Sequence, residues 1–276
     1  MPELPEVETV RQTLRQLVLN ETIATIDIHW PKIIKQPDDA KKFQALLTNE
    51  TILEIDRKGK FLIFELDHYS LVSHLRMEGK YAVHPSEEEA DKHTHILFHF
   101  NSGKSLHYHD VRKFGTMHVF KKGDERVNRP LNQLGPDPFE HHYNLENLAP
   151  KITRSQRVIK NILLDQAVIA GLGNIYVDEA LFRAQIHPLR TGASLTRTEI
   201  ATILQEAKAT ITEAVKQGGT TIRSYLNSQG QMGMFQQQLY AYGQTGKPCM
   251  RCGNQIEKIR VANRGTHLCP SCQQTS

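Results

Sequence analysis

The chain has 276 residues, a formal net charge of +4 and 39% hydrophobic residues, which is ordinary for a globular protein of one to three domains. This length excludes a single small disulfide-stapled module, and the longest apolar runs fall far short of the ~20 residues that a membrane helix needs. Residues 1–10 contain three glutamates and no basic or apolar signal segment, so we expect a cytoplasmic protein without membrane contact.

The first predicted element is a helix of about fifteen residues that begins almost at the N-terminus. Its apolar residues recur at spacings of three and four, and Pro5 suits a first helical turn. Residues 22–120 then contain short runs rich in β-branched and aromatic residues, separated by turn residues such as those at 58–59 and 101–103. Several strands at this spacing predict a β-sandwich or barrel.

The C-terminal half of the chain is predicted to be mainly helical. Residues 134–150 contain three prolines and little helical periodicity, which is typical of an interdomain linker. Ser155 and Asn174 can each cap a helix, and Thr196 with Glu199 forms a capping box for a third helix, which ends at glycines 218–219. The polar, glycine-dotted segment that follows is predicted to be a loop.

All four cysteines lie within the last 28 residues, as Cys249, Cys252, Cys269 and Cys272. Their C-x2-C-x16-C-x2-C spacing is typical of a zinc ion held by four thiolates. Four protein ligands leave no open position, so the ion would be structural rather than catalytic. The alternatives are two disulfides, which a reducing cytosol disfavours, or four unused thiols, which the clustering disfavours.

Positive charge is concentrated toward the C-terminus. Residues 1–130 carry a net charge of −1 and residues 131–276 carry +5. Within residues 247–276 five basic side chains accompany a single acidic one, Glu257. This density favours a polyanionic partner, although a solvated basic face that only aids solubility is the alternative.

Pro2 is the most unusual chemical feature of the sequence. A small second residue favours removal of the initiator methionine, which would leave a secondary α-amine. An α-amine has a pKa of about 7.7–8 against ~10.4 for lysine, so more of it is an unprotonated nucleophile at neutral pH. Such an amine forms an iminium directly, and Glu3 or Glu6 could move protons beside it. Alternatively, Pro2 and these glutamates only shape the start of the helix.

Three further segments combine residue types that suit a polyanion. Residues 57–60 place three cations around a glycine, residues 171–174 expose backbone N–H groups at a predicted helix start, and residues 107–114 mix cations with aromatic side chains. The alternative for residues 57–60 is an ordinary solvated hairpin turn, and the alternative for residues 107–114 is a histidine-rich strand edge. Residues 171–174 lack the full dinucleotide-binding pattern.

These segments, in this order and over essentially the full length, resemble the formamidopyrimidine-DNA glycosylases, bacterial 8-oxoguanine repair enzymes. The resemblance rests on MPELPEVET, RKGK, DVRKFG, AGLGNIYVDE and the terminal four-cysteine finger. It implies an α+β protein with an N-terminal helix and β-sandwich domain and a helical helix-two-turns-helix domain with a four-cysteine zinc finger. The implied limits are 1–133 for the sandwich, 134–150 for a linker, 151–236 for the helical domain and 237–276 for the finger.

The resemblance also implies roles for individual residues. Pro2 is similar to the nucleophile, Glu3 to the acid/base, Lys60 to the cation for proton transfer, and Arg264 to the finger arginine that grips phosphates and assists δ-elimination. Met77, Arg112 and Phe114 look like the residues that fill the gap left by an extruded nucleotide, with Arg112 addressing the orphaned cytosine. The remaining implied DNA contacts are His74, His93, Arg154, Asn174, Tyr242 and Lys258.

The function expected from this resemblance is excision of oxidised purines from damaged double-stranded DNA, followed by β,δ-elimination at the sugar. One structural zinc ion and a monomer are expected. A loop at roughly residues 218–238 would cover the lesion. The sister enzyme for oxidised pyrimidines is a rival that Leu4 disfavours, and a non-catalytic zinc-ribbon DNA-binding protein is a rival from another class.

Overall fold

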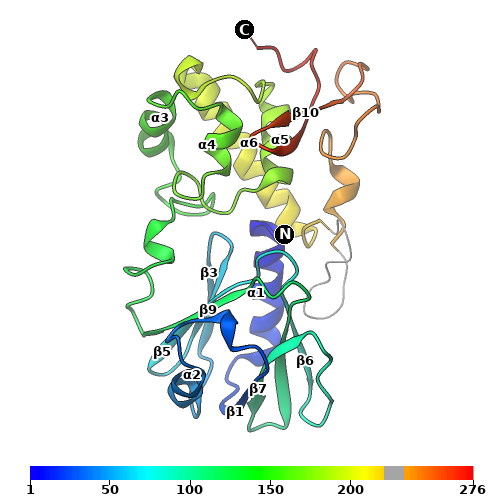
Figure 1. Ribbon diagram of the computed structural model, residues 1–276. Helices are drawn as coiled ribbons and strands as arrows, with labels where there is room; N and C mark the ends of the chain where they lie inside the picture. The colour runs from blue at the N-terminus through cyan, green and yellow to red at the C-terminus, as the bar shows by residue number, and fades with distance from the viewer. Residues whose placement is uncertain (221–232, 276) are drawn as a thin grey trace. The chain divides into compact units, whose positions relative to one another are not determined.

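The computed structural model describes residues 1–220 and 233–275, and these residues form two compact units (Figure 1). The N-terminal unit comprises Met1–Asn132 with Gly218–Gly233, and the C-terminal unit comprises Gln133–Gln217 with Met234–Ser276. Within the described ranges, no helix combines the length and the apolar character of a membrane span. The division of the chain into four parts at residues 133, 150 and 236 stays a prediction.

The N-terminal unit begins with helix α1 (Leu4–Val18), which confirms the predicted helix of about fifteen residues. Its apolar face is buried at Val7, Val10 and Leu14. A second helix, α2 (Ala40–Leu47), was not predicted from the sequence. Its first turn is capped by Asp39, whose side chain accepts a hydrogen bond from the Lys42 N–H at 2.7 Å.

Two sheets make up the rest of the N-terminal unit. The four-stranded sheet has the order β1 (Ile23–Ile28), β7 (Thr94–Phe100), β8 (Lys104–His109) and β6 (Lys80–Pro85), all antiparallel. The five-stranded sheet has the order β2 (Ile34–Gln36), β9 (Thr116–Lys121), β5 (Tyr69–His74), β4 (Phe61–Glu65) and β3 (Glu54–Lys58). Side chains of both sheets share one core with α1, and the rings of Phe64 and Tyr81 meet in it at 5.5 Å. The predicted β-sandwich is confirmed.

The C-terminal unit is helical and ends in a hairpin. Its helices are α3 (Leu145–Thr153), α4 (Ile159–Leu164), α5 (Asn174–Ala184) and α6 (Arg197–Lys216), and the hairpin consists of β10 (Glu257–Val261) and β11 (Arg264–Leu268). Short 3-10 turns in the chain are η1 (Pro31–Ile33), η2 (Leu131–Gln133), η3 (Gly192–Ser194) and η4 (Phe235–Gln238). The predicted capping box of Thr196 and Glu199 opens α6, and the chain leaves this helix through two left-handed glycines, 218 and 219.

Three sequence-based expectations about this unit are wrong. Helix α3 begins within residues 134–150, where no helical periodicity was predicted, and runs on to Thr153. Asn144 caps it, Leu148 and Ile152 are buried, and Pro150 is tolerated within the helix. Ser155 caps no helix, since residue 158 instead bridges to residue 191 and α4 starts only at 159. Asn174 is the first residue of α5 rather than its cap.

Candidate functional site

The N-terminus of α1 is organised around the carboxylate of Glu6. Pro2 and Glu3 are buried immediately before the helix, and the Glu3 N–H donates to Glu6 Oε2 at 2.8 Å. The other oxygen, Oε1, accepts hydrogen bonds from the Thr220 N–H at 2.8 Å and the Thr220 hydroxyl at 3.1 Å. A Cβ on Gly219 would lie 2.6 Å from this same oxygen. Glu6 therefore fixes the residues beside Pro2 to residues 219–220.

The β3–β4 turn, which carries Lys60, is tied to the same helix through Glu8. Arg57 donates to Glu8 Oε2 at 2.9 Å and to the carbonyl of left-handed Gly59 at 2.9 Å, while Arg11 bonds Glu8 Oε1 at 2.6 Å. Burial by itself would raise the pKa of Glu8, but the hydrogen bonds from Arg11 and Arg57 outweigh it and lower that pKa. Glu8 thus fixes α1 against the turn that holds the buried Lys60.

His74 lies at the end of β5, opposite Phe61, with the two rings edge to face at 4.4 Å. Burial, together with the positive charges of Arg76 and Lys60, lowers the pKa of His74 to about 3. Its Nδ1 accepts a hydrogen bond from the Arg76 N–H at 2.9 Å. The neutral ring therefore carries its proton on Nε2, where it can donate to an acceptor such as a phosphate.

We expect His74→Gln to flatten the dependence of stability on pH. The folded-state pKa lies below the value of 6.5 for a free imidazole, so stabilisation by the neutral ring is fully present above pH 6.5 and is lost as the pH falls toward 3. Between pH 7.5 and 5 this loss amounts to about 2 kcal/mol. Urea unfolding of the wild-type protein and the variant at both pH values measures this loss. If the variant shows the same difference in free energy of unfolding between the two pH values as the wild type, the prediction is wrong. His68→Gln, at an exposed ring, is the control.

The residues expected to fill a gap in DNA lie in two connections of the N-terminal unit. Arg112 and Phe114 follow β8, and the guanidinium carbon of Arg112 is 4.7 Å from the centre of the Phe114 ring. Both side chains are exposed, Phe114 to 52%. Met77 is partly exposed in the β5–β6 connection. His93 precedes β7, with its ring 5.6 Å from that of His109.

In the C-terminal unit, a buried ion pair fixes the hairpin against helices α4 and α5. Lys160, fully buried, donates to Asp178 at 2.6 Å and to the Thr266 hydroxyl at 2.7 Å. The second oxygen of Asp178 accepts a hydrogen bond from the His267 N–H at 2.8 Å. Asn174, expected to contact phosphate, donates its side-chain amide to the Gly265 carbonyl at 2.9 Å. The segment from Gly265 to His267 is therefore held by polar groups, of which Lys160 and Asp178 are buried.

Arg264 lies at the first position of β11, directly after the turn of the hairpin. The turn consists of Ala262 and Asn263, both left-handed with φ of 48° and 62°, and Arg264 pairs with Val261. Its side chain is exposed, as are those of Lys258 and Arg260 on β10. The hairpin therefore presents three cations to solvent from a rigid base.

We expect Lys160→Met to lower the free energy of unfolding by about 3–5 kcal/mol, because it leaves Asp178 buried with one charge partner removed. Urea unfolding measures the loss. Lys151→Met, at an exposed position on α3, is the control and should change stability by less than ~0.5 kcal/mol. Equal stabilities of the two variants would contradict the role assigned to the buried pair.

Glu179 holds the backbone around Tyr242. This fully buried carboxylate accepts hydrogen bonds from the N–H groups of Tyr240, Ala241 and Tyr242 at 2.8–2.9 Å. Burial raises the pKa of Glu179 above its ordinary value, although these three bonds oppose the change. The Tyr242 ring packs at 4.8 Å against that of His267 on β11. Arg154, the remaining predicted contact, is exposed at the C-terminus of α3.

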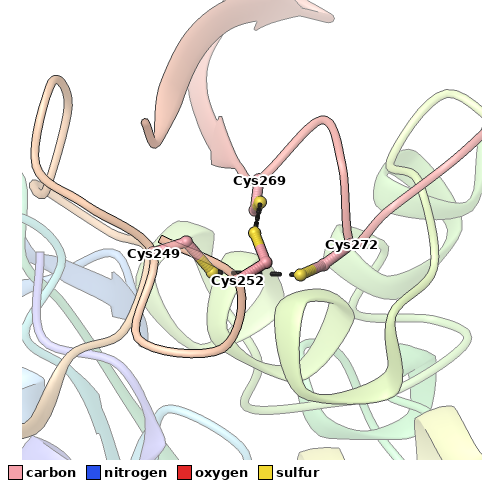
Figure 2. A group of neighbouring side chains, drawn as sticks. All are labelled: Cys249, Cys252, Cys269 and Cys272. Carbon is pink, nitrogen blue, oxygen red and sulfur yellow. Dashed lines mark hydrogen bonds between the residues drawn. The ribbon is translucent and has the colours of Figure 1, made fainter. Parts of the chain in front are cut away.

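The four cysteines converge on one point beside the hairpin (Figure 2). Their sulfur atoms all lie within 4.8 Å of one another, with 3.9 Å between Cys249 and Cys272 and 3.5 Å between Cys252 and Cys269. A tetrahedron with zinc–sulfur bonds of 2.3 Å has edges of about 3.8 Å. The thiols are free rather than joined in disulfides. The donor set and its spacing therefore fit a zinc ion.

The fold and these clusters define a zinc-finger protein of the helix-two-turns-helix class. Residues 1–117 match the formamidopyrimidine-DNA glycosylase N-terminal domain, residues 134–225 match the H2TH domain of the same glycosylase, and residues 246–275 match a zinc finger found in FPG and IleRS. The chain belongs to the formamidopyrimidine-DNA glycosylase family. The resemblance seen in the sequence motifs is confirmed.

Similar proteins span the whole chain. A formamidopyrimidine-DNA glycosylase of Oceanobacillus iheyensis is 58% identical and one of Shouchella clausii is 55% identical, each over 99% of this chain and at least 98% of its own length. Two structures of the Lactococcus lactis Fpg, one with DNA containing N7-benzyl-Fapy-dG and one with DNA containing an abasic site, have a TM-score of 0.92 at 40% identity. They cover 99% of this chain and at least 99% of those chains.

The expected lesion-covering loop lies largely in residues 221–232, outside the described residues. The structure brings together two sets of predicted residues, Arg112 with Phe114 and the four cysteines. It also identifies supporting residues to which the sequence analysis gave no role, namely Glu8, Asp110, Lys160, Asp178 and Glu179. All of them except Lys160 lie within the motifs MPELPEVET, DVRKFG and AGLGNIYVDE, which was the available sequence signal.

Proposed function

We propose that the chain is a bifunctional DNA glycosylase and AP lyase that removes oxidised purines from double-stranded DNA. The observation that carries the proposal is the buried start of α1, where Pro2 and Glu3 precede a helix that Glu8 fixes to the turn of Lys60. The names of the relatives and the damaged DNA in the Lactococcus lactis complexes support the choice of substrate.

In the proposed reaction, the initiator methionine is removed and the secondary amine of Pro2 attacks C1′ of the damaged nucleotide. The bond between C1′ and the base breaks, and a proton moves onto the departing base. Glu3 then protonates the ring oxygen as the sugar opens to an iminium linked to Pro2. This cation is an electron sink, so loss of a C2′ proton expels the 3′-phosphate, and a second elimination expels the 5′-phosphate.

The other functional residues support these steps. Lys60 assists proton transfer, and Arg264 grips the phosphates that flank the lesion and assists δ-elimination. His74, His93, Arg154, Asn174, Tyr242 and Lys258 contact the DNA backbone, so binding weakens steeply with salt. Met77, Arg112 and Phe114 occupy the space that the extruded nucleotide leaves. One structural zinc ion, held by the four cysteines, keeps the cationic hairpin in place. A monomer in the cytoplasm remains the expectation.

The deciding experiment is covalent trapping. The protein, mixed with duplex DNA carrying 8-oxoguanine opposite cytosine and reduced with borohydride, should cross-link through Pro2 and, without borohydride, leave a gapped strand. A parallel duplex with an oxidised pyrimidine separates the sister activity, and an undamaged duplex is the control. If fully processed protein binds the damaged duplex yet forms no cross-link and leaves the strand intact, the enzyme proposal fails and a DNA-binding role survives.

A further inference from the structure

One buried carboxylate organises the loop that carries Arg112 and Phe114. Asp110 is fully buried. Its Oδ1 accepts a hydrogen bond from the Arg112 N–H at 3.1 Å, and its Oδ2 accepts from the N–H groups of Phe114 and Gly115 at 2.9 and 2.8 Å. Three backbone N–H groups of this loop therefore depend on one side chain, and replacing it would leave all three without this acceptor.

The backbone on both sides of Phe114 has a restricted conformation. A Cβ on Gly115 would lie 1.7 Å from the hydroxyl oxygen of Tyr108, so no other residue fits there. Lys113 adopts a left-handed conformation with φ of 59°, which strains the backbone of a residue other than glycine. Such a conformation persists only where the surroundings hold it.

A cation–π contact accompanies this unusual backbone. The Nζ of Lys113 lies 4.0 Å from the centre of the Trp30 ring, a distance at which the ring attracts an ammonium group. The two neighbours of Lys113, Arg112 and Phe114, instead stack on one another in solvent. Lys113 is thus held against Trp30. Arg112 and Phe114 are left exposed to solvent as a preformed pair.

We propose that Asp110 and Lys113 are positioning residues, which set the preference for the base opposite the lesion by holding Arg112 and Phe114 in a stacked arrangement before DNA arrives. This inference rests on the proposed function. A side chain that reads an orphaned base loses less conformational entropy on binding if it is already ordered. Neither Asp110 nor Lys113 needs to touch DNA in this role.

Two variants with matched controls test the proposal. Asp110→Asn keeps the shape and weakens the acceptor, and its control is Glu50→Gln, another buried carboxylate of this unit that accepts a backbone N–H at 2.8 Å. Lys113→Met removes the charge over Trp30, and its control is Lys32→Met, since Lys32 lies 5.5 Å from the same ring. Excision is measured on 8-oxoguanine opposite cytosine or adenine, and borohydride trapping is measured on a single-stranded abasic oligonucleotide, which has no opposite base.

For Asp110→Asn we expect excision opposite cytosine to fall by about 10²-fold, with a smaller fall opposite adenine, so that the cytosine-to-adenine ratio shrinks. For Lys113→Met the fall should be about 2- to 5-fold. Trapping on the single strand should stay within about twofold of wild type for every variant, because only the opposite-base contact is disturbed. A general loss of folding would instead reduce all substrates equally.

The proposal is overturned if each variant matches its control in both the excision rate and the cytosine-to-adenine ratio. If Asp110→Asn fails to fold, the excision rate and the cytosine-to-adenine ratio of Lys113→Met test the proposal alone. If the wild-type protein excises no base, the proposed function fails. The positioning role is then decided by binding to duplexes with a tetrahydrofuran abasic analogue opposite cytosine or adenine, where the same loss of preference is expected for the two variants only.

Discussion

Replacing Pro2 by leucine should abolish the borohydride-trapped complex and reduce strand cleavage at least about 10³-fold. A bulky second residue keeps the initiator methionine in place, so the nitrogen at position 2 becomes an amide that cannot attack C1′. The remaining α-amine is displaced by one residue and is primary. Single-turnover trapping on an abasic duplex measures the effect, with duplex binding measured in parallel to show that the variant still folds and engages DNA.

Pro5→Ala is the matched control, because it alters the other proline at the start of α1. If the two prolines only shape the helix start, both variants should lose activity and stability to a similar extent. If Pro2 is the nucleophile, Pro5→Ala should trap DNA nearly as well as wild type, with at most a modest loss of stability. Trapping by the Pro2→Leu variant at the wild-type rate would end the nucleophile proposal.

Cys252→Ser should remove the metal and, with it, most of the affinity for duplex DNA. Structural zinc sites contribute apparent binding free energies of about 10–16 kcal/mol, and three thiolates hold the ion far less well than four. The exposed cations of the hairpin then lose their rigid base, so we expect affinity to fall at least about 100-fold, with a shallower dependence on salt. Metal analysis and fluorescence-anisotropy titrations at several salt concentrations test both parts.

The control for this variant is Ser271→Ala, which lies between two of the cysteines and loses only a hydrogen bond from the side chain of Asn254. It should retain one equivalent of zinc and bind DNA within about threefold of wild type. Full metal occupancy in Cys252→Ser would contradict the assignment of that thiol as a ligand. Loss of metal with unchanged DNA affinity would show that the finger does not position the hairpin.

Local signals were sufficient for much of the fold. The capping box of Thr196 and Glu199 depends on residues three apart, and both the helix and its start were predicted correctly. The cysteine spacing predicted a cluster that the structure brings within 4.8 Å. Helix α3 was missed because the prolines around it outweighed two buried apolar positions, Leu148 and Ile152, that have helical spacing.

The supporting residues of the site could not be predicted from local patterns, because their partners lie far away in the sequence. Lys160 bonds Thr266, 106 positions away, and Arg57 bonds Glu8, 49 positions away. The hydrophobic periodicity of the sequence does not distinguish such buried charged residues from charged residues that are exposed to solvent. Asn174 illustrates the same limit, since its side chain bonds the Gly265 carbonyl instead of capping α5. Tertiary packing decides these roles.

Trp30 gives the protein a built-in optical probe. It is the only tryptophan in the chain, and its ring faces the ammonium of Lys113 in the loop of Arg112 and Phe114. Any displacement of that loop changes the polarity next to the indole, so the intrinsic emission spectrum should shift without a dye or an unnatural base. Stopped-flow mixing could then time the insertion of the loop separately from bond cleavage, in unlabelled wild-type protein.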